Sequence, residues 1–176
     1  MSAKKAKSPK GKKAKKVLGV IAILFVLFIA VTVVVTLIGN NANLKKANSF
    51  ETVQYENQLK PVKDQNGNWT FTTDKDFKVM QLTDIHIGGW MSLDKDAKAL
   101  NAVAAMITAE KPDLVVVTGD IAYPVPFQAG TFNNLSGAKI FAALMEKLGV
   151  YYTVCFGNHD SEAYGTHKTS DFRSLG

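Results

Sequence analysis

Three short stretches of the sequence carry residue types that can hold metal ions, and each stretch follows an apolar run. Carboxylate, imidazole and amide oxygens suit Mn, Fe or Zn. Two such ions about 3.5–4 Å apart need a shared carboxylate between them. The sequence therefore presents a candidate centre for two divalent transition metal ions. Its residues are Asp84 and His86 in LTDIHIG, Asp120 in VTGD, and Asn158, His159 and Asp160 in GNHD.

The spacing of these residues supports a common site. Asp84 and His86 are two positions apart, so in an extended chain they project to the same side, either as a hydrogen-bonded pair or as two ligands. Each stretch alone is also explained by turn and cap chemistry, in which Asn and Asp are frequent. Their recurrence at three successive strand ends favours a metal site. Gly119 gives the backbone room to turn before Asp120.

The elements that must position these residues alternate between strand and helix. This β-α-β-α-β order predicts an α/β fold with a parallel sheet and right-handed crossovers, in which ligands bind beyond the carboxyl ends of the strands. The expected elements are strand 77–83, helix 92–111, strand 113–120, helix 137–149 and strand 150–156.

Several local features follow from this pattern. Ser92 is expected to cap the first of these helices, and Gly149 to end the second. The unbroken apolar run 114–117 predicts a strand covered on both faces. Cys155 is expected to be a small buried residue. Residues 68–73 predict a short strand in a hairpin, paired before Pro61 or with the next strand.

Charge is distributed unevenly along the 176 residues. Residues 1–16 hold eight lysines and no acidic residue, and Lys45 and Lys46 follow an apolar run. From residue 47 onward, eleven basic residues stand against all fifteen acidic ones, a formal net charge of −4. We therefore expect no binding of nucleic acid by the basic tail. The tail is expected to set topology and to attract anionic lipid.

Residues 17–38 form an uncharged apolar run of 22 residues. A helix of this length spans about 33 Å and can cross the roughly 30 Å hydrocarbon core of a bilayer. The alternative, a cleaved signal peptide, has a shorter apolar region of about 7–15 residues. We expect a transmembrane helix over 17–38 in the lipid bilayer. The other predicted parts are the basic tail 1–16, a stalk and approach segment 39–75, and a domain over 76–176.

The positions of the lysines predict the orientation of this anchor. The positive-inside rule places the tail 1–16 in the cytoplasm and the domain outside, as a single-pass membrane protein with an extracytoplasmic domain. Lys45 and Lys46 favour the opposite topology. Protease accessibility of the domain in intact cells separates the two orientations.

Taken together, LTDIHIG, DLVVVTGDIAYP and FGNHDSE resemble the first three signature blocks of the calcineurin-like metallophosphoesterases. The resemblance covers about Phe77 to Glu162, and the order and strand context of the blocks also match. It implies that the β-α-β-α-β run is the first half of an α/β/β/α sandwich. It also implies hydrolysis of phosphate mono- or diesters through attack by a metal-activated hydroxide.

The resemblance assigns a role to each metal-ligating residue. Asp84 and His86 would bind the first metal ion, and Asp120 would bridge both ions. Asn158 would bind the second ion through its amide oxygen. The ions would supply the positive field that an anionic phosphate ester requires and that a mildly acidic domain lacks.

The two residues after Asn158 are implied to be catalytic. His159 would stabilise the phosphate transition state or protonate the leaving oxygen, and Asp160 would orient His159. A loop over 123–134 follows the Asp120 block and either lines the substrate pocket or serves as a packed connection.

The sequence departs from the family pattern after Glu162. The family has later Gly-His and Gly-His-x-His blocks that complete the metal shells, and neither occurs up to Gly176. His167 has neither spacing and is expected to be a surface residue, with substrate contact as the alternative. We expect this chain to be the first part of a longer domain that by itself binds metal poorly and hydrolyses little. The alternative function is a non-catalytic, membrane-anchored module that binds a ligand or a metal.

Overall fold

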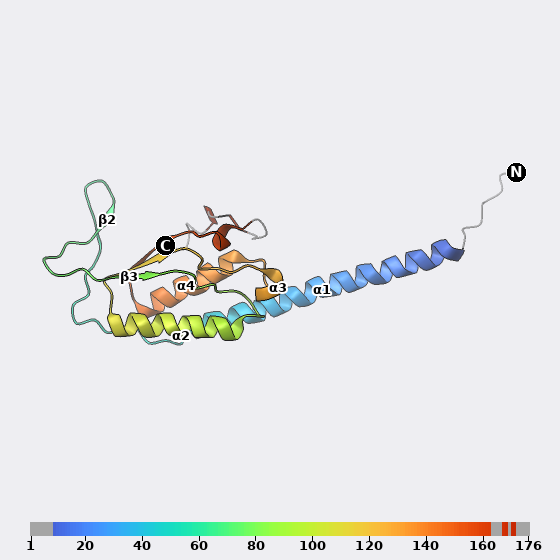
Figure 1. Ribbon diagram of the computed structural model, residues 1–176, viewed down its shortest axis with the longest axis horizontal. Coiled ribbons are helices and arrows are strands. Elements are labelled where there is room, and N and C mark those ends of the chain that lie inside the picture. The colour runs from blue at the N-terminus through green and yellow to red at the C-terminus, as the bar shows by residue number, and fades with distance from the viewer. Residues whose placement is uncertain (1–8, 163–166, 169, 172–176) are drawn as a thin grey trace. The chain divides into compact units, whose positions relative to one another are not determined.

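The computed structural model describes residues 9–162, 167–168 and 170–171. It divides into two compact units, Met1–Val35 and Thr36–Gly176. Residues 1–8 of the predicted tail and residues 172–176 of the predicted domain lie outside the described residues. Figure 1 shows the helices and strands along the chain.

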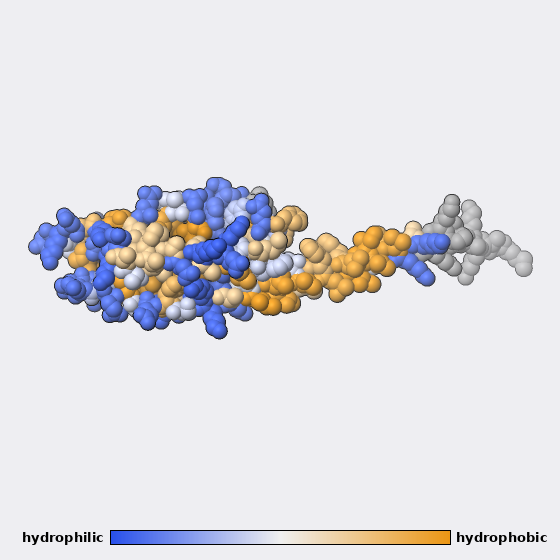
Figure 2. Space-filling model, turned by 60° about the horizontal axis from the view of Figure 1, so that its bottom comes forward, coloured by the Kyte–Doolittle hydropathy of each residue, from blue (hydrophilic) through white to orange (hydrophobic). Residues whose placement is uncertain are grey.

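Helix α1 (Pro9–Ala47) contains the whole predicted transmembrane run. The most apolar 18-residue stretch of α1 has a mean hydropathy of 3.2, and none of that stretch is buried within the protein. Figure 2 shows hydrophobic side chains along this helix, next to a hydrophilic start. Within the described part of the chain, this is the one helix long and apolar enough to cross a membrane.

The second unit is built on a parallel sheet in the order β3-β4-β5. Its strands are β3 (Val79–Leu82), β4 (Leu114–Thr118) and β5 (Tyr152–Cys155). The crossovers contain α2 (Leu93–Glu110) and α4 (Asn134–Leu148), which pack on each other and lie on the same face of the sheet (Figure 1). The predicted β-α-β-α-β order and the parallel sheet are confirmed.

The core lies between the sheet and these two helices. Val115 and Val117 of β4 are fully buried in a cluster with α2 and α4 side chains, whereas Leu114 and Val116 are half-buried. The prediction that β4 is covered on both faces is therefore wrong. Both crossovers run along one face, so the helices leave the second face less covered.

The helix ends agree with the sequence in part. Gly149 ends α4 in the left-handed conformation with φ 72°, as predicted. Ser92 flanks α2, but its side chain makes no cap. Its hydroxyl instead donates toward Asp96. Helix α4 begins three residues earlier than predicted, because the Asn133 side chain accepts a hydrogen bond from the Ser136 N–H and caps this end.

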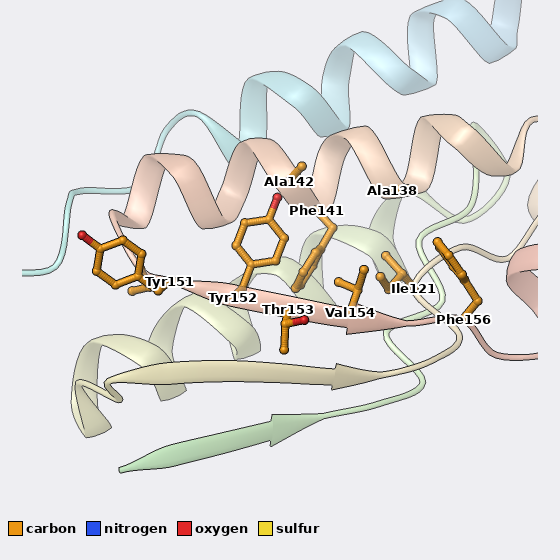
Figure 3. A pocket seen from close by; sticks show the side chains of 10 residues that line it. Ile121, Ala138, Phe141, Ala142, Tyr151, Tyr152, Thr153, Val154 and Phe156 are labelled. Carbon is orange, nitrogen blue, oxygen red and sulfur yellow. The ribbon is translucent and has the colours of Figure 1, made fainter. Parts of the chain in front are cut away.

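Strand β5 lies at one edge of the sheet, and Cys155 on it is exposed rather than buried. An open apolar groove of about 410 Å³ runs along β5 and α4 (Figure 3). None of the predicted metal ligands lines it. The groove is lined by Ile121, Ala138, Phe141, Ala142, Val150, Tyr151, Tyr152, Thr153, Val154 and Phe156.

The segment expected to be a stalk begins as part of the packed unit. Asn43, Ala47 and Val53 are buried, and the latter two belong to the hydrophobic core. The polar composition of residues 39–48 hid this packing, because Asn43 is buried through a polar partner rather than an apolar one. Farther along, β1 (Val62–Lys63) and β2 (Trp69–Thr70) form a hairpin, as predicted. The predicted partners are wrong, because β2 pairs with residues just after Pro61 and not with residues before it or with β3.

That polar partner is the carboxylate of Asp96 on α2, which is 1% exposed. Its Oδ2 accepts hydrogen bonds from Asn43 Nδ2 at 2.6 Å and from Ser92 Oγ at 3.1 Å, and its Oδ1 accepts from the Gly88 N–H at 3.2 Å. One buried acid thus joins the end of α1, the start of α2 and the loop after β3.

Replacing Asn43 by alanine removes one hydrogen-bond donor to the buried Asp96 carboxylate. We expect Asn43→Ala to lower the free energy of unfolding by about 1–3 kcal/mol. Denaturant titration in mild detergent, followed by circular dichroism, measures this loss. Asn41→Ala, at an exposed position of the same helix, is the matched control. Equal stability of the two variants would contradict the assignment.

Burial raises the pKa of Asp96 above its ordinary value of 3.8 and outweighs the hydrogen bonds it accepts. The folded chain therefore holds this proton more tightly than the unfolded chain. The contribution of Asp96 to the free energy of unfolding therefore falls as pH rises from 3.8 through the raised pKa. We expect Asp96→Asn to flatten the decline of the melting temperature in that window. A variant curve as steep as the native one would show that Asp96 does not cause the decline.

Candidate metal centre

The loops after β3 and β4 run side by side beyond the carboxyl ends of these strands. The Asp84 N–H donates to the Gly119 carbonyl at 3.2 Å, and the His86 N–H donates to the Asp120 carbonyl at 3.0 Å. A further parallel bridge joins Ile87 to Ala122. Hydrogen bonding between these two segments therefore continues past the strands and fixes the backbones that carry the candidate ligands.

The backbone at these ligands is not extended. Asp84, His86 and Asp120 each have φ 55°, in the left-handed region that non-glycine residues rarely adopt. The expectation that Asp84 and His86 meet because they lie in an extended strand is therefore wrong. β3 ends at Leu82, and the left-handed turns direct the two side chains together. Strained backbone of this kind clusters at functional sites.

The side chains of three predicted ligands converge. His86 Nε2 lies 3.7 Å from Asp84 Oδ1 and 3.8 Å from Asp120 Oδ2. Atoms of His86, Asp120 and His159 that can ligate a metal all lie within 4.8 Å of one another. Among the described residues, the buried His86 Nε2 has no hydrogen-bond partner. A ring nitrogen without a partner between two carboxylates fits a bound cation, so the residues suit the metal that the sequence implies.

Two glycines allow this approach of the strand ends. A Cβ on Gly119 would lie 2.8 Å from the Gly157 backbone, and a Cβ on Gly157 would overlap Asp120 Oδ1. Gly119 also has φ 115°, which side-chain-bearing residues rarely adopt. The two positions therefore need glycine for space, and Gly157 leaves room for the Asp120 carboxylate.

The carboxylate of Asp160 is fully buried, and it contacts backbone rather than a histidine ring. Its Oδ2 accepts the N–H groups of Asp120 at 2.8 Å and Gly157 at 2.9 Å. Its Oδ1 accepts the Ala122 N–H at 2.9 Å. The structure thus differs from the expectation that Asp160 orients His159. The bonds from Asp120 and Ala122 join the loops after β4 and β5, and the bond from Gly157 lies within the loop after β5.

A different acid lies beside the His159 ring. Glu162 Oε2 is 3.0 Å from His159 Nδ1, an ion-pair distance without hydrogen-bond alignment. The ring of Tyr123 packs against both imidazoles, with centroids 5.0 Å from His86 and 4.9 Å from His159. Sequence reasoning missed these contacts of Glu162 and Tyr123. The spacing of three residues between His159 and Glu162 was the one available signal.

Two further predicted residues, Asn158 and His167, lie in or after the loop that follows β5. Asn158 directly precedes the short helix η1 (His159–Ser161) and is exposed. His167 Nδ1 lies 3.5 Å from Asp171 Oδ2. The fully buried Asn134 side chain bonds the backbone of both His167 and Asp160. His167 is thus tied next to the loop after β5 through its backbone.

Comparison with known proteins agrees with this fold. Residues 77–175 match the calcineurin-like phosphoesterase family, and the chain belongs to that family. It is 29% identical over 111 residues to the probable inactive purple acid phosphatase 14 of Arabidopsis thaliana. It is 33% identical over 92 residues to the uncharacterized metallophosphoesterase YkuE of Bacillus subtilis.

These matches cover part of each protein. They include 56% and 51% of this chain but 27% and 28% of the respective relatives. The chain therefore spans about a quarter of the length of these two relatives. The family membership confirms the resemblance drawn from the three sequence blocks.

Gly157→Ala tests whether the glycine pair positions the Asp120 carboxylate. The new methyl would displace this carboxylate, so we expect metal affinity to fall about 10–100-fold, as when supporting contacts of a ligand are lost. Calorimetric titration of the full chain with Mn²⁺ measures the change. Gly11→Ala, where an added Cβ contacts nothing within 4 Å, is the control. Equal Mn²⁺ affinities of the two variants would contradict the role given to Gly157.

Proposed function

We propose that this chain carries the metal site of a phosphoesterase that hydrolyses phosphate mono- or diesters at a membrane. The observation that carries the proposal is the convergence of Asp84, His86 and Asp120 around an unpartnered His86 Nε2. Membership of the calcineurin-like phosphoesterase family supports a hydrolase acting on phosphate esters.

Four residues would hold two divalent metal ions. Asp84 and His86 would bind the first ion, Asp120 would bridge the two, and Asn158 would bind the second through its amide oxygen. Asp120 suits a bridging position because Oδ1 is fixed by the His159 N–H at 2.9 Å, while Oδ2 faces His86. Bound ions would supply a hydroxide nucleophile near neutral pH and would neutralise charge on the phosphoryl oxygens.

His159 would contact the substrate rather than serve as a metal ligand. Its imidazole borders the ligand cluster, with its ring centroid 5.0 Å from that of His86. From there it would donate a proton to the leaving oxygen or a hydrogen bond to the phosphoryl group. Glu162, at 3.0 Å from Nδ1, would orient the ring, and Tyr123 would hold its face. Asp160 would act indirectly, by fixing the backbone of the loops that carry Asp120 and His159.

The apolar part of α1 would anchor the site to a lipid bilayer. Most side chains of residues 17–38 are exposed, and the run carries no charge. The eight lysines before this run favour a cytoplasmic N-terminus and an extracytoplasmic domain. This orientation would place the phosphate ester substrate outside the cytoplasm.

A non-catalytic metal-binding module is the second candidate. One relative is named a probable inactive phosphatase, which favours considering a site that binds metal without turnover. The two functions differ in measurable ways. A phosphoesterase requires both metal binding and hydrolysis that depends on His159, whereas a binding module requires metal binding alone.

Two substitutions separate metal binding from proton transfer. We expect Asp120→Asn to bind Mn²⁺ at least about tenfold more weakly, because it loses a charged ligand. We expect His159→Gln to keep the Mn²⁺ affinity of the unmodified chain and to lower its turnover, itself expected to be small, by about 10²–10⁴-fold, because it loses the proton donor. Calorimetry with Mn²⁺ and hydrolysis of p-nitrophenyl phosphate and its bis ester provide the two measurements.

Asn68→Ala, in the exposed hairpin turn, is the control for both measurements. Loss of Mn²⁺ binding in His159→Gln would contradict the role given to His159. Mn²⁺ binding with hydrolysis that is the same in His159→Gln and the unmodified chain would favour the non-catalytic module.

A further inference from the structure

Within the second unit, large apolar side chains are exposed in segments that pack against residues 36–40 of α1. All of them belong to the unit 36–176, in the loops that follow β3 and β4. They include two aromatic residues on or next to α3 (Pro126–Ala129) and one in the loop before α2. The exposed fractions are 41% for Trp90, 51% for Met91, 87% for Phe127 and 47% for Phe132.

Direct contacts hold this surface against the last turn of the apolar run. Thr36 Oγ1 donates to the Gly130 carbonyl at 3.1 Å. A Cβ on Gly39 would lie 2.8 Å from the Trp90 backbone, which shows how closely these segments pack. Asn40 Nδ2 donates to Ser136 Oγ at 2.9 Å. Since the apolar run ends at Ile38, these contacts place the surface beside the end of the run.

The two loops form one surface. The N–H groups of Gly89 and Met91 both donate to the Ala129 carbonyl, at 3.1 and 3.3 Å. The C-terminal end of α3 is thereby joined to the Trp90 loop, and Figure 1 shows α3 beside the α1 residues of this unit. Residues 85–93 and 121–138 contain no Lys, Arg, Asp or Glu. The surface is therefore aromatic and free of formal charge over both loops.

We propose that these residues, which we call the aromatic rim (Trp90, Met91, Phe127 and Phe132), insert into the interface of the same bilayer that α1 spans. The inference rests on the membrane anchoring proposed above. Trp is enriched at membrane interfaces, where its apolar ring and its N–H are both accommodated. Amphipathic helices at such an interface bury their apolar face by about 5–10 Å, and we expect the rim side chains to reach a similar depth.

The rim is linked to the metal centre by short connections. Trp90 follows His86 by four residues, and α3 begins three residues after Tyr123. The Tyr123 hydroxyl donates to Gln128 Oε1 on α3 at 2.6 Å, while its ring packs on His86 and His159. Insertion of the rim therefore holds the candidate ligands next to the membrane surface and favours phosphate esters presented there.

Tryptophan fluorescence in vesicles tests the proposal on the full chain. Its two tryptophans are Trp90 in the rim and Trp69 on β2, which Figure 1 shows at the other end of the second unit from α3. Trp69→Phe leaves Trp90 as the reporter, and Trp90→Phe leaves Trp69 as the matched control. Phe127→Trp, made with both of those substitutions, gives an independent reporter at an 87% exposed position. Each variant is reconstituted in phosphatidylcholine vesicles with bromine at shallow or deep acyl positions.

We expect shallow bromines to reduce the emission of the Trp90 and Phe127→Trp reporters more than deep bromines do, and to leave the Trp69 emission unchanged. Unchanged emission of both rim reporters, in chains that float with the vesicles after alkaline washing, would overturn the rim proposal and leave the anchor intact. Failure of the unmodified chain to float would overturn the anchor and the rim together. Rim emission that changes with protein concentration but not with bromine would identify a second copy as the partner and overturn the bilayer contact.

Discussion

The candidate metal centre depends on one buried carboxylate, that of Asp160. It accepts N–H groups from the loop after β4, at Asp120 and Ala122, and from the loop after β5, at Gly157. Each of these donors would cost about 1–3 kcal/mol if left unpaired in the interior. A carboxylate has enough lone pairs to satisfy all of them, so the two strand ends are held in one geometry.

This constraint explains how Asp120 is positioned. Its backbone is held by Asp160, its Oδ1 accepts the His159 N–H, and the missing side chain of Gly157 leaves space for its carboxylate. The opposite oxygen then faces His86. The left-handed backbone at three of the candidate ligands costs about 1–3 kcal/mol for each residue. The hydrogen bonds between the loops hold those residues in place despite this cost.

A second buried carboxylate extends the same principle to the end of α1. Asp96 joins the end of α1 to the loop after β3, through Asn43 and the Gly88 N–H. That loop carries His86 at one end and Trp90 at the other. The end of α1, the residues of the proposed aromatic rim and the candidate metal ligands therefore belong to one packed unit.

The sequence was sufficient to predict the order of strands and helices, and the convergence of three candidate ligands at the sheet edge. Strand ends in a parallel sheet share one edge, so the position of Asp84, His86 and Asp120 along the chain implied their proximity. Hydropathy could not reveal the burial of Asn43, because the side chain is stabilised by a polar partner. The sequence also could not show that Glu162, rather than Asp160, lies beside the His159 ring. The path of the loop after β5 decides this contact, and the spacing of residues along the chain does not determine that path.

The most direct test is a crystal structure of the full chain grown with Mn²⁺, with an anomalous difference map collected near the manganese edge. The account predicts anomalous density within coordination distance of His86 Nε2 and of carboxylate oxygens from both Asp84 and Asp120. Anomalous density elsewhere, or a map with none at saturating Mn²⁺, would contradict it.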